Sequence, residues 1–399
     1  MLGLALEGGG VKGAFHMGAI KAYLEQGYTF SGIAGTSIGA LNGAVVAQED
    51  FEMGYRWWEA MDNSLIFDIE QIQIQKFIDK KIDKEALLYL SSKVKDLIDN
   101  RGLDTSKMRA MLHQLIDEQK LRASPIDFGM VTVSVSDLKP LELYKEDIPP
   151  GKMIEYLMAS ANFPAFKIEP IDGKFYIDGG FYDNCPINLL SRKGYKDIIA
   201  IRTLGIGVIW KPEDDQANVT SILPSDDLGM ILNFSNSLIH KNLKMGYYDT
   251  LRVIKGLKGH RYYILPDDND RFLQILLRLS DEQINRIGDM MMLPKMEPKR
   301  LLFEKVLPEL SRMLSLSASA TYQDLIIRLI EPIAENAGID RYKLFSFSDY
   351  MEKVKTANIP PTDKTKSLLS SLAEGTKLAS VFSKETILKK VAKEVLHAI

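Results

Sequence analysis

Three short segments of the sequence carry residues whose types and spacing could do chemistry. They are a glycine-rich turn at 8–13, a Gly-x-Ser-x-Gly turn at 35–39 and an Asp-Gly-Gly turn at 178–180, and each follows an apolar run. A glycine turn after a strand presents backbone N–H groups that bind anions, and a serine on such a turn can act as a nucleophile. The two chemistries to compare are therefore nucleotide binding and nucleophilic catalysis.

The first turn matches Gly8-x-Gly10-x-x-Gly13 between a predicted strand and helix, as in a dinucleotide site. Such a site also needs an acidic residue about 20 residues further on, which binds the ribose. The next strand ends in GIAGTSIGA without Asp or Glu, and no Lys-Ser or Lys-Thr closes a Walker loop. We therefore expect no nucleotide. The N–H groups of Gly9 and Gly10, with Val11 as a further candidate, are expected to stabilise a transient oxyanion.

The second turn, Gly35-Thr-Ser37-Ile-Gly39, lies between a short strand and a helix, which is the context of a nucleophile elbow. A side chain at either flanking glycine would clash in so tight a turn. The simpler interpretation is a turn on which Ser37 only caps the helix. Because both glycine turns follow parallel strands, they should lie at the same edge of the sheet, with the first turn facing Ser37.

A serine nucleophile needs a proton acceptor. The histidines are His16, His113, His240, His260 and His397. The chain order of a triad would allow His240 or His260, but neither has a catalytic context, and His16 is expected to be a packing or surface residue of a helix. Asp178, in FYIDGGFYDN, ends an apolar strand, and partial burial would raise its pKa towards the working range of a base. An Asp that only caps a turn is the simpler interpretation, and Asp183 is the local competitor.

The elements that position these residues follow from the hydrophobic pattern. Strands are predicted at 2–6, 30–35, 127–136, 174–180 and 197–203, and helices at 13–26 and 38–48. Residues 51–122 indicate a helical insertion, 211–227 an exposed loop, and 260–266 a final edge strand. From about residue 278 the chain is predicted to be helical, with Pro360-Pro361 as a linker. The alternation predicts an α/β fold with neighbouring parallel strands.

Composition narrows the class of protein. The 399 residues carry a net charge of -3, from 50 basic and 53 acidic residues, so no nucleic-acid partner is expected. The single cysteine, Cys185, excludes an intrachain disulfide and is expected to be a buried packing residue. No secretory signal or membrane-spanning stretch is recognised, so a cytoplasmic protein is expected, with a membrane surface as a candidate peripheral contact. No cofactor and no metal are expected, since no cluster has ligand spacing.

Taken together, the three segments resemble the patatin-like phospholipases, serine acyl hydrolases that use a Ser–Asp dyad. The segments GGGVKG, GTSIG and DGG match the family's oxyanion loop, nucleophile motif and aspartate motif, and ASANFPAFKI at 159–168 resembles the segment before the aspartate. Lys12 stands where the family often has arginine, and Glu7 replaces a frequent aspartate. The resemblance covers about residues 1–205, 227–266 are similar to the continuation in bacterial members, and nothing after about 280 matches.

The resemblance implies a three-layer α/β/α patatin-like fold with a mostly parallel central sheet. It implies a catalytic domain at 1–270, which includes the helical insertion at 51–122, and a helical C-terminal region of unknown role at 271–399. Ser37 would be the nucleophile, Asp178 the proton acceptor, and Gly8, Gly9 and Gly10 the oxyanion hole. The supporting motif residues would be Val11, Lys12, Gly13, Gly35, Gly39, Gly179 and Gly180. No calcium requirement is implied.

The implied substrate is a fatty-acyl ester of a phospholipid or lysophospholipid. The alternatives are a thioesterase, a general carboxylesterase with the same dyad, and a catalytically idle scaffold. An oxidoreductase that binds a nucleotide is disfavoured by the missing ribose acid.

Two hypotheses concern surfaces. Residues 51–122 should cap the site, where Trp57, Trp58 and Phe77 could shape an acyl channel, although packing against the domain is favoured for most of them. In the tail, Leu388, Val391 and Val395 form an apolar stripe, with Lys389, Lys390 and Lys393 on other faces. Such a helix can lie in a lipid interface. Packing of the stripe onto the protein's own C-terminal region is the favoured alternative.

Overall fold

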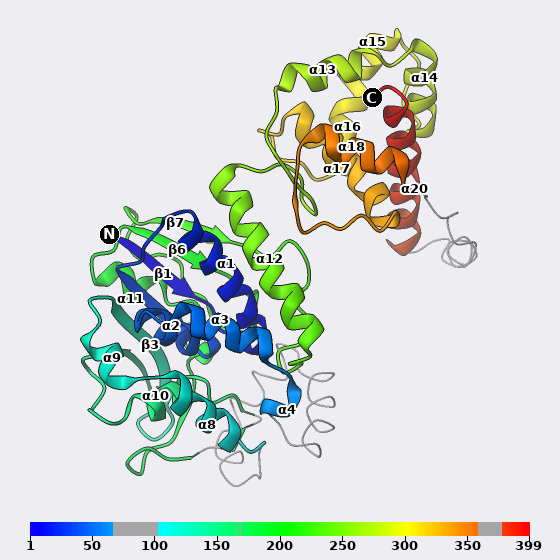
Figure 1. Cartoon of the computed structure of the whole chain (residues 1–399). Coiled ribbons are helices and arrows are strands. Elements are labelled where there is room, and N and C mark those ends of the chain that lie inside the picture. Colours follow the sequence, from blue (N-terminus) through cyan, green and yellow to red (C-terminus); the bar gives the residue numbers. More distant parts are fainter. Residues whose placement is uncertain (67–102, 165, 168, 358–376) are drawn as a thin grey trace. The chain divides into compact units, whose positions relative to one another are not determined.

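The computed structural model describes residues 1–66, 103–164, 166–167, 169–357 and 377–399. The chain forms two compact units, Met1–Leu251 and Arg252–Ile399 (Figure 1). The domain boundary predicted after residue 270 stays a prediction.

Unit 1 is built around a mixed sheet that has seven strands in the described part of the chain. The parallel strands lie in the order β3 (Asp127–Ser134), β2 (Gly32–Thr36), β1 (Leu2–Leu6), β6 (Asp197–Ile201) and β7 (Asn218–Ile222). Two short strands, β4 (Lys139–Tyr144) and β5 (Tyr176–Asp178), pair antiparallel with β3. The central strands β1 and β2 are short apolar runs that are buried almost throughout, as expected for parallel strands covered on both faces.

Helices cover both faces of this sheet (Figure 1). The helices of unit 1 are η1 (Gly10–Gly13), α1 (Ala14–Glu25), α2 (Ile38–Ala47), α3 (Phe51–Ala60), α4 (Asn63–Ile66), α8 (Ser106–Leu115), α9 (Glu118–Ala123), α10 (Met153–Ser160), η2 (Gly179–Phe181), α11 (Ile187–Arg192) and most of α12 (Asn236–Lys255). The small residues of α2 let it lie close on β1, β2 and β3. On the opposite face, Leu190 of α11 packs in a cluster with Ala5, Ala34 and Ile198. The predicted α/β fold, with a mostly parallel sheet between helices, is confirmed.

The strands β2 and β5 lie end to end along the same side of β3. Thr36 of β2 pairs with Val131, and Asp178 of β5 pairs with the next residue of β3, Thr132. The other side of β3 is taken by β4. Because β5 runs antiparallel to β3 and β2 runs parallel to it, the carboxyl ends of β2 and β5 meet. This register brings Ser37, which follows Thr36, to the end of β5.

Three segments differ from the sequence-based expectation. Residues 211–227 were expected to form an exposed loop but contain β7, an edge strand whose outward polar residues hide its pairing with β6. The edge strand β4 was not predicted, because its KPLELY sequence is polar and half exposed. Residues 260–266 do not add a final edge strand to the main sheet. Instead, β8 (Tyr263–Ile264) pairs with β9 (Leu344–Phe345) in unit 2.

Unit 2 is mostly helical, as predicted. Its helices are α13 (Asn269–Leu277), α14 (Asp281–Met290), α15 (Pro298–Leu301), the π-helical turn η3 (Leu302–Val306), α16 (Leu307–Met313), α17 (Tyr322–Asn336), α18 (Phe347–Thr356) and α20 (Lys377–Leu396). Val391 and Val395 of α20 are 0% and 2% exposed in the core of this unit, and Leu388 packs against that core. The favoured interpretation, packing of the stripe onto the C-terminal region, is therefore confirmed, and the lipid-interface hypothesis for this stripe is wrong. Pro360-Pro361 lies outside the described residues.

The described ends of the 51–122 insertion are helical, as α3, α4, α8 and α9. Trp58 is buried against α2, where its Nε1 donates to Asn42 Oδ1 at 2.9 Å, so it packs against the domain. Phe77 lies outside the described residues. In the described part of the chain, no helix is both long enough and apolar enough to cross a bilayer.

Candidate active site

Ser37 lies on the turn between β2 and α2, with φ of 56° and ψ of −128°. Few non-glycine residues adopt such dihedrals, and they are typical of a nucleophile elbow. The turn is held because Ser37 N–H donates to Ser160 Oγ at 3.0 Å, and this hydroxyl donates to Val131 O at 2.7 Å. A Cβ on Gly35 or Gly39 would lie 2.2 Å from a backbone oxygen, so both glycines are required. Ser37 makes no side-chain cap to α2, so the plain helix-cap interpretation is wrong.

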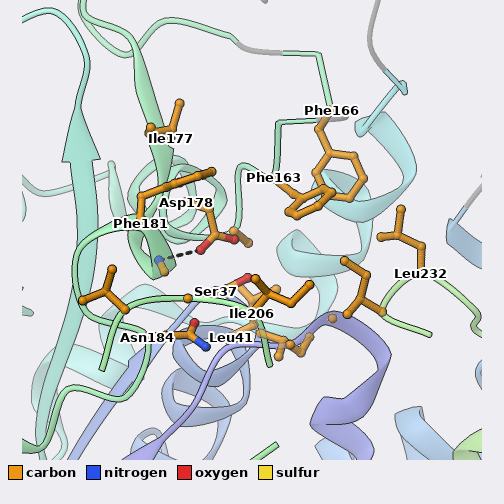
Figure 2. Close-up of a pocket in the computed structure, with 18 of the residues that line it drawn as sticks. Ser37, Leu41, Phe163, Phe166, Ile177, Asp178, Phe181, Asn184, Ile206 and Leu232 are labelled. Atoms are coloured by element: carbon orange, nitrogen blue, oxygen red, sulfur yellow. Dashed lines mark hydrogen bonds between the residues drawn. The ribbon is translucent and has the colours of Figure 1, made fainter. Parts of the chain in front are cut away.

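Asp178 ends β5 and faces Ser37 across the site (Figure 2). Its Oδ1 accepts the Gly180 N–H at 2.8 Å, and the Ser37 hydroxyl lies near enough to lower its pKa. Desolvation in this buried position raises the pKa of Asp178 from 3.8 to about 6, although the Gly180 N–H and the Ser37 hydroxyl lower it. A carboxylate with this pKa is a stronger base than an ordinary Asp and is still largely ionised at neutral pH.

The competing carboxyl group, Asp183, occupies a different environment. Burial raises its pKa to about 7, and its Oδ1 accepts the Cys185 N–H at 3.1 Å. Its backbone carbonyl accepts the Thr36 hydroxyl at 2.7 Å. Asp183 does not line the pocket that contains Ser37. Asp183 therefore supports the end of β2 through its backbone carbonyl and not through its carboxyl group. The neighbouring Cys185 is buried, as expected.

In the glycine-rich loop between β1 and η1, some N–H groups anchor the loop and others are available to a ligand. Gly8 N–H and Val11 N–H each donate to a backbone carbonyl of a neighbouring segment at 2.9 Å. Across the residues that the structure describes, no acceptor pairs with the N–H groups of Gly9 and Gly10, and both residues line the pocket beside Ser37. Gly10 has a φ of 58°, which favours glycine. The available donors are thus Gly9 and Gly10, whereas Gly8 and Val11 anchor the loop.

A buried carboxylate holds this loop in place. Glu7 is fully buried, and its Oε2 accepts Arg202 Nε and the Thr203 N–H, both at 2.8 Å. The Thr203 hydroxyl in turn donates to the Gly8 carbonyl at 2.5 Å. Since the C=O and N–H of a trans peptide point in opposite directions, a Gly8 carbonyl fixed towards Thr203 turns the Gly9 N–H away from it. Thr203 therefore sets the direction of one of the two available donors.

Ser37 and Asp178 open onto a pocket of about 510 Å³ (Figure 2). Its apolar side chains come from several elements: Ile38, Leu41, Met108, Phe163, Phe166, Ile177, Phe181, Ile206, Val208, Ile209, Ile231, Leu232 and Phe234. Among the lining residues that the structure describes, Asp178 is the only one with an ionisable side chain. Such a pocket suits a long apolar group whose reacting end lies at Ser37. Met108 belongs to α8, so one described end of the insertion borders the pocket.

The other predicted residues lie around this site. Val11, Lys12 and Gly13 belong to η1, and burial lowers the pKa of Lys12. Gly179 and Gly180 form the start of η2 directly after Asp178.

None of the five histidines lines the pocket. His16 is fully buried, and desolvation lowers its pKa to about 3. Within the described ranges, no group of His, Cys, Asp and Glu is arranged to hold a metal ion.

Two supporting residues were missed by the sequence-based reasoning. Ser160 lies within the segment 159–168 that resembles the family, and this was the one available signal for it. Thr203 follows β6 without any motif. Both act through hydrogen bonds to residues far away in the sequence, at 3.0 Å to Ser37 N and 2.5 Å to Gly8 O.

Comparison with known proteins gives several matches. The family model described as patatin-like phospholipase matches residues 4–191. The patatin-like phospholipase domain-containing protein 6 of Mus musculus is 24% identical over 208 residues, which are 50% of this chain and 13% of that protein. The neuropathy target esterase sws of Drosophila melanogaster is 24% identical over 205 residues, with the same coverage of 50% and 13%. An uncharacterized NTE family protein of Mycobacterium bovis is 26% identical over 220 residues, 55% of this chain and 53% of that protein.

Two solved structures are similar at low identity. The crystal structure of VipD from Legionella pneumophila aligns over 100% of this chain and 90% of that chain, with a TM-score of 0.39 and 16% identity. The type III effector protein ExoU aligns over 98% and 76%, with a TM-score of 0.34 and 12% identity.

Proposed function

Because residues 4–191 belong to the patatin-like phospholipase family, we propose that the chain is a serine lipid acyl hydrolase. Its substrates are fatty-acyl esters of phospholipids or lysophospholipids. The observation that carries the proposal is that Ser37, on its strained turn, and the buried Asp178 face each other at one apolar pocket.

In the proposed reaction, Asp178 accepts the proton of Ser37 Oγ while that oxygen attacks the acyl carbonyl carbon. The oxyanion that forms receives hydrogen bonds from Gly9 and Gly10. Collapse of this tetrahedral intermediate expels the alcohol portion of the lipid, which takes the proton from Asp178. Water then attacks the acyl-enzyme with Asp178 as base, which releases the fatty acid and restores Ser37.

We assign the oxyanion hole to Gly9 and Gly10 and treat Gly8 as a positioning residue. The occupied N–H of Gly8 supports this division of roles. Preorganised donors are worth most where water is excluded, and the apolar lining provides such a setting.

We further propose that residues 51–122 cap the pocket. Met108 supports this idea, because it carries the described end of the insertion to the pocket wall. Trp58 packs against α2 and would hold the first helix of the cap in place.

The test combines active-site labelling with product analysis. A fluorophosphonate probe should label Ser37 in the wild-type chain, and mass spectrometry should detect free fatty acid released from a mixed lipid panel. The Ser37→Ala variant should do neither. Absence of both labelling and fatty acid release in the folded wild-type chain would identify a catalytically idle scaffold. Labelling with release only from thioesters or short soluble esters would move the assignment to those substrates.

A further inference from the structure

The segment 204–210, with the sequence LGIGVIW, lines the pocket with residues 206–209 and exposes alternate side chains. Leu204, Ile206, Val208 and Trp210 are 56%, 36%, 38% and 49% exposed. The intervening residues are less exposed, and two of them are glycines that press against the glycine-rich loop and Asn184. We call the four outward side chains the apolar rim. A contiguous row of large exposed apolar side chains marks an interaction site more often than a plain surface.

The apolar rim is fixed to the turn that carries Asp178. Val208 N–H donates to Gly180 O at 2.9 Å, and Val208 O accepts the Asn184 N–H at 2.6 Å. Trp210 Nε1 donates to Tyr182 O at 2.9 Å, which satisfies the indole N–H while the ring stays half exposed. The rim is therefore held in place by the same turn that presents Asp178.

The rim is continuous with the pocket wall. Ile206 and Val208 line the pocket as well as being exposed, and Figure 2 shows Ile206 next to Ser37. A second segment brings apolar surface to the same opening, because Met230 is 43% exposed and the next two residues, Ile231 and Leu232, line the pocket. An apolar path thus leads from the outer surface to the nucleophile.

We propose that the apolar rim docks onto the surface of a phospholipid bilayer, so that an acyl chain passes from the bilayer into the pocket. The proposal rests on the proposed hydrolase function. A protein seated on the rim would cover the pocket mouth, whereas a bilayer delivers the substrate through it. A tryptophan whose N–H is satisfied and whose ring is exposed is typical of the membrane interface.

The charges beside the rim indicate which bilayer it fits. Lys211 directly follows Trp210, but Glu213 and Asp214 come next, and Asp214 is already paired with Lys196. This mixture offers no net basic patch for anionic lipids. Docking should therefore depend on apolar contact and occur on zwitterionic phosphatidylcholine vesicles, with little gain from anionic lipid.

The experiment measures vesicle binding in the full chain with Ser37→Ala, so that binding is separated from hydrolysis. Sedimentation with phosphatidylcholine vesicles is compared among three proteins. The first is the Ser37→Ala chain, the second adds Leu204→Gln and Trp210→Gln, and the third adds Leu24→Gln and Tyr28→Gln. Leu24 and Tyr28 are a matched exposed pair, 36% and 41%, at the amino-terminal edge of the sheet.

We expect the Leu204→Gln/Trp210→Gln pair to weaken vesicle binding by about tenfold or more, since two large apolar side chains leave the interface. The Leu24→Gln/Tyr28→Gln pair should bind as the parent does. In the active background, both pairs should keep turnover of a soluble short-chain ester, which shows that the variants fold.

Equal binding by all three proteins, or no binding by the Ser37→Ala parent, would overturn the docking proposal. If the rim pair instead abolished self-association of the chain in light scattering, while vesicles bound none of the proteins, the rim would belong to a contact between copies. Failure of the hydrolase proposal is distinguishable, because it would appear as missing fatty acid release with vesicle binding intact.

Discussion

Asp178→Asn should make unit 1 more stable at pH 8 while removing catalysis. The carboxylate is buried, and desolvation raises its pKa from 3.8 to about 6. An amide of nearly the same size avoids that cost. In the wild type, the Gly180 N–H donates to Asp178 Oδ1 at 2.8 Å. The amide oxygen of the variant can accept this same N–H, and its NH₂ group can donate to the Ser37 hydroxyl. The amide cannot accept the Ser37 proton, so turnover should be lost.

The size and the pH dependence of this effect follow from the pKa shift. A rise from 3.8 to about 6 means that the folded protein binds the proton more tightly than the unfolded chain. The free energy of unfolding therefore decreases as pH rises from 3.8 to about 6 and then levels off. At 1.36 kcal/mol per unit, the cost of the ionised side chain above this range is about 3 kcal/mol. Asp178→Asn should recover up to this amount at pH 8 and almost none of it below pH 4.

Urea unfolding, monitored by tryptophan fluorescence, measures the difference in unfolding free energy between Asp178→Asn and the wild type, and it reports on unit 1. The three tryptophans, Trp57, Trp58 and Trp210, all lie in unit 1. Asp183→Asn is the matched control, because burial also raises the pKa of Asp183, to about 7, yet this side chain lies outside the pocket. It should show a similar pH-dependent gain in stability and keep most of its turnover.

A parallel measurement is the pH profile of the wild-type chain. If Asp178 acts as a base, kcat/KM should rise with pH and level off above about 6. Below that point it should fall by about tenfold per pH unit, as the fraction of ionised carboxylate falls.

The reasoning would be refuted if Asp178→Asn were less stable than the wild type at pH 8, or if its effect were equal at pH 4 and pH 8. Either result would mean that the ionised side chain carries no desolvation cost. If Asp183→Asn lost turnover as completely as Asp178→Asn, the base would have to be reassigned.

Three further predictions are checked by the turnover of a soluble short-chain ester. Ser37→Ala should lose turnover by at least about a thousandfold with its unfolding curve nearly unchanged, and near-normal turnover would remove Ser37 from the nucleophile role. Thr203→Val should lower kcat by about tenfold to a hundredfold with KM unchanged. The Gly8 carbonyl would lose its hydrogen-bond donor, and the Gly9 N–H would no longer be held in its direction. Thr203→Ser keeps a hydroxyl and should retain most of kcat. Loss of kcat in Thr203→Ser too would indicate damaged packing instead. His16→Ala should destabilise unit 1, since His16 is fully buried, yet it should keep kcat, as should His240→Ala and His260→Ala. A histidine variant as inactive as Ser37→Ala would require a triad.

Local patterns predicted the parts of the site that depend on short stretches of chain. The glycine turns after β1 and β2 were recognisable because an apolar run, a tight turn and a helix follow one another within a few residues. The position of Asp178 relative to Ser37 was not accessible in this way. It depends on β5, a three-residue strand whose antiparallel place beside β3 is decided by tertiary pairing.

The division of labour within the glycine loop was also beyond sequence patterns. The motif suggests three equivalent glycines, yet Gly8 N–H is occupied by Asn184 O at 2.9 Å. Which N–H groups stay available is decided by partners far along the chain, such as Thr203 on the Gly8 carbonyl. Thr203 has no sequence signal of its own because its hydroxyl acts on a backbone group, which any residue supplies.

Two apolar patterns in the sequence are compatible with lipid contact, the stripe of α20 and the row at 204–210. Only the exposure of their side chains distinguishes them. The stripe of α20 has helical spacing and charged neighbours, but its Val391 and Val395 are buried in the core of unit 2. The row at 204–210 has the alternation of a strand, which usually places one face in a core. Here two of the three inward positions are glycines that lie against the glycine-rich loop and Asn184, so the four alternate apolar side chains stay exposed, and two of them, Ile206 and Val208, also line the pocket. Lipid contact is therefore better sought at the pocket mouth than in the tail, since surface that is already buried in a core cannot also bind a membrane.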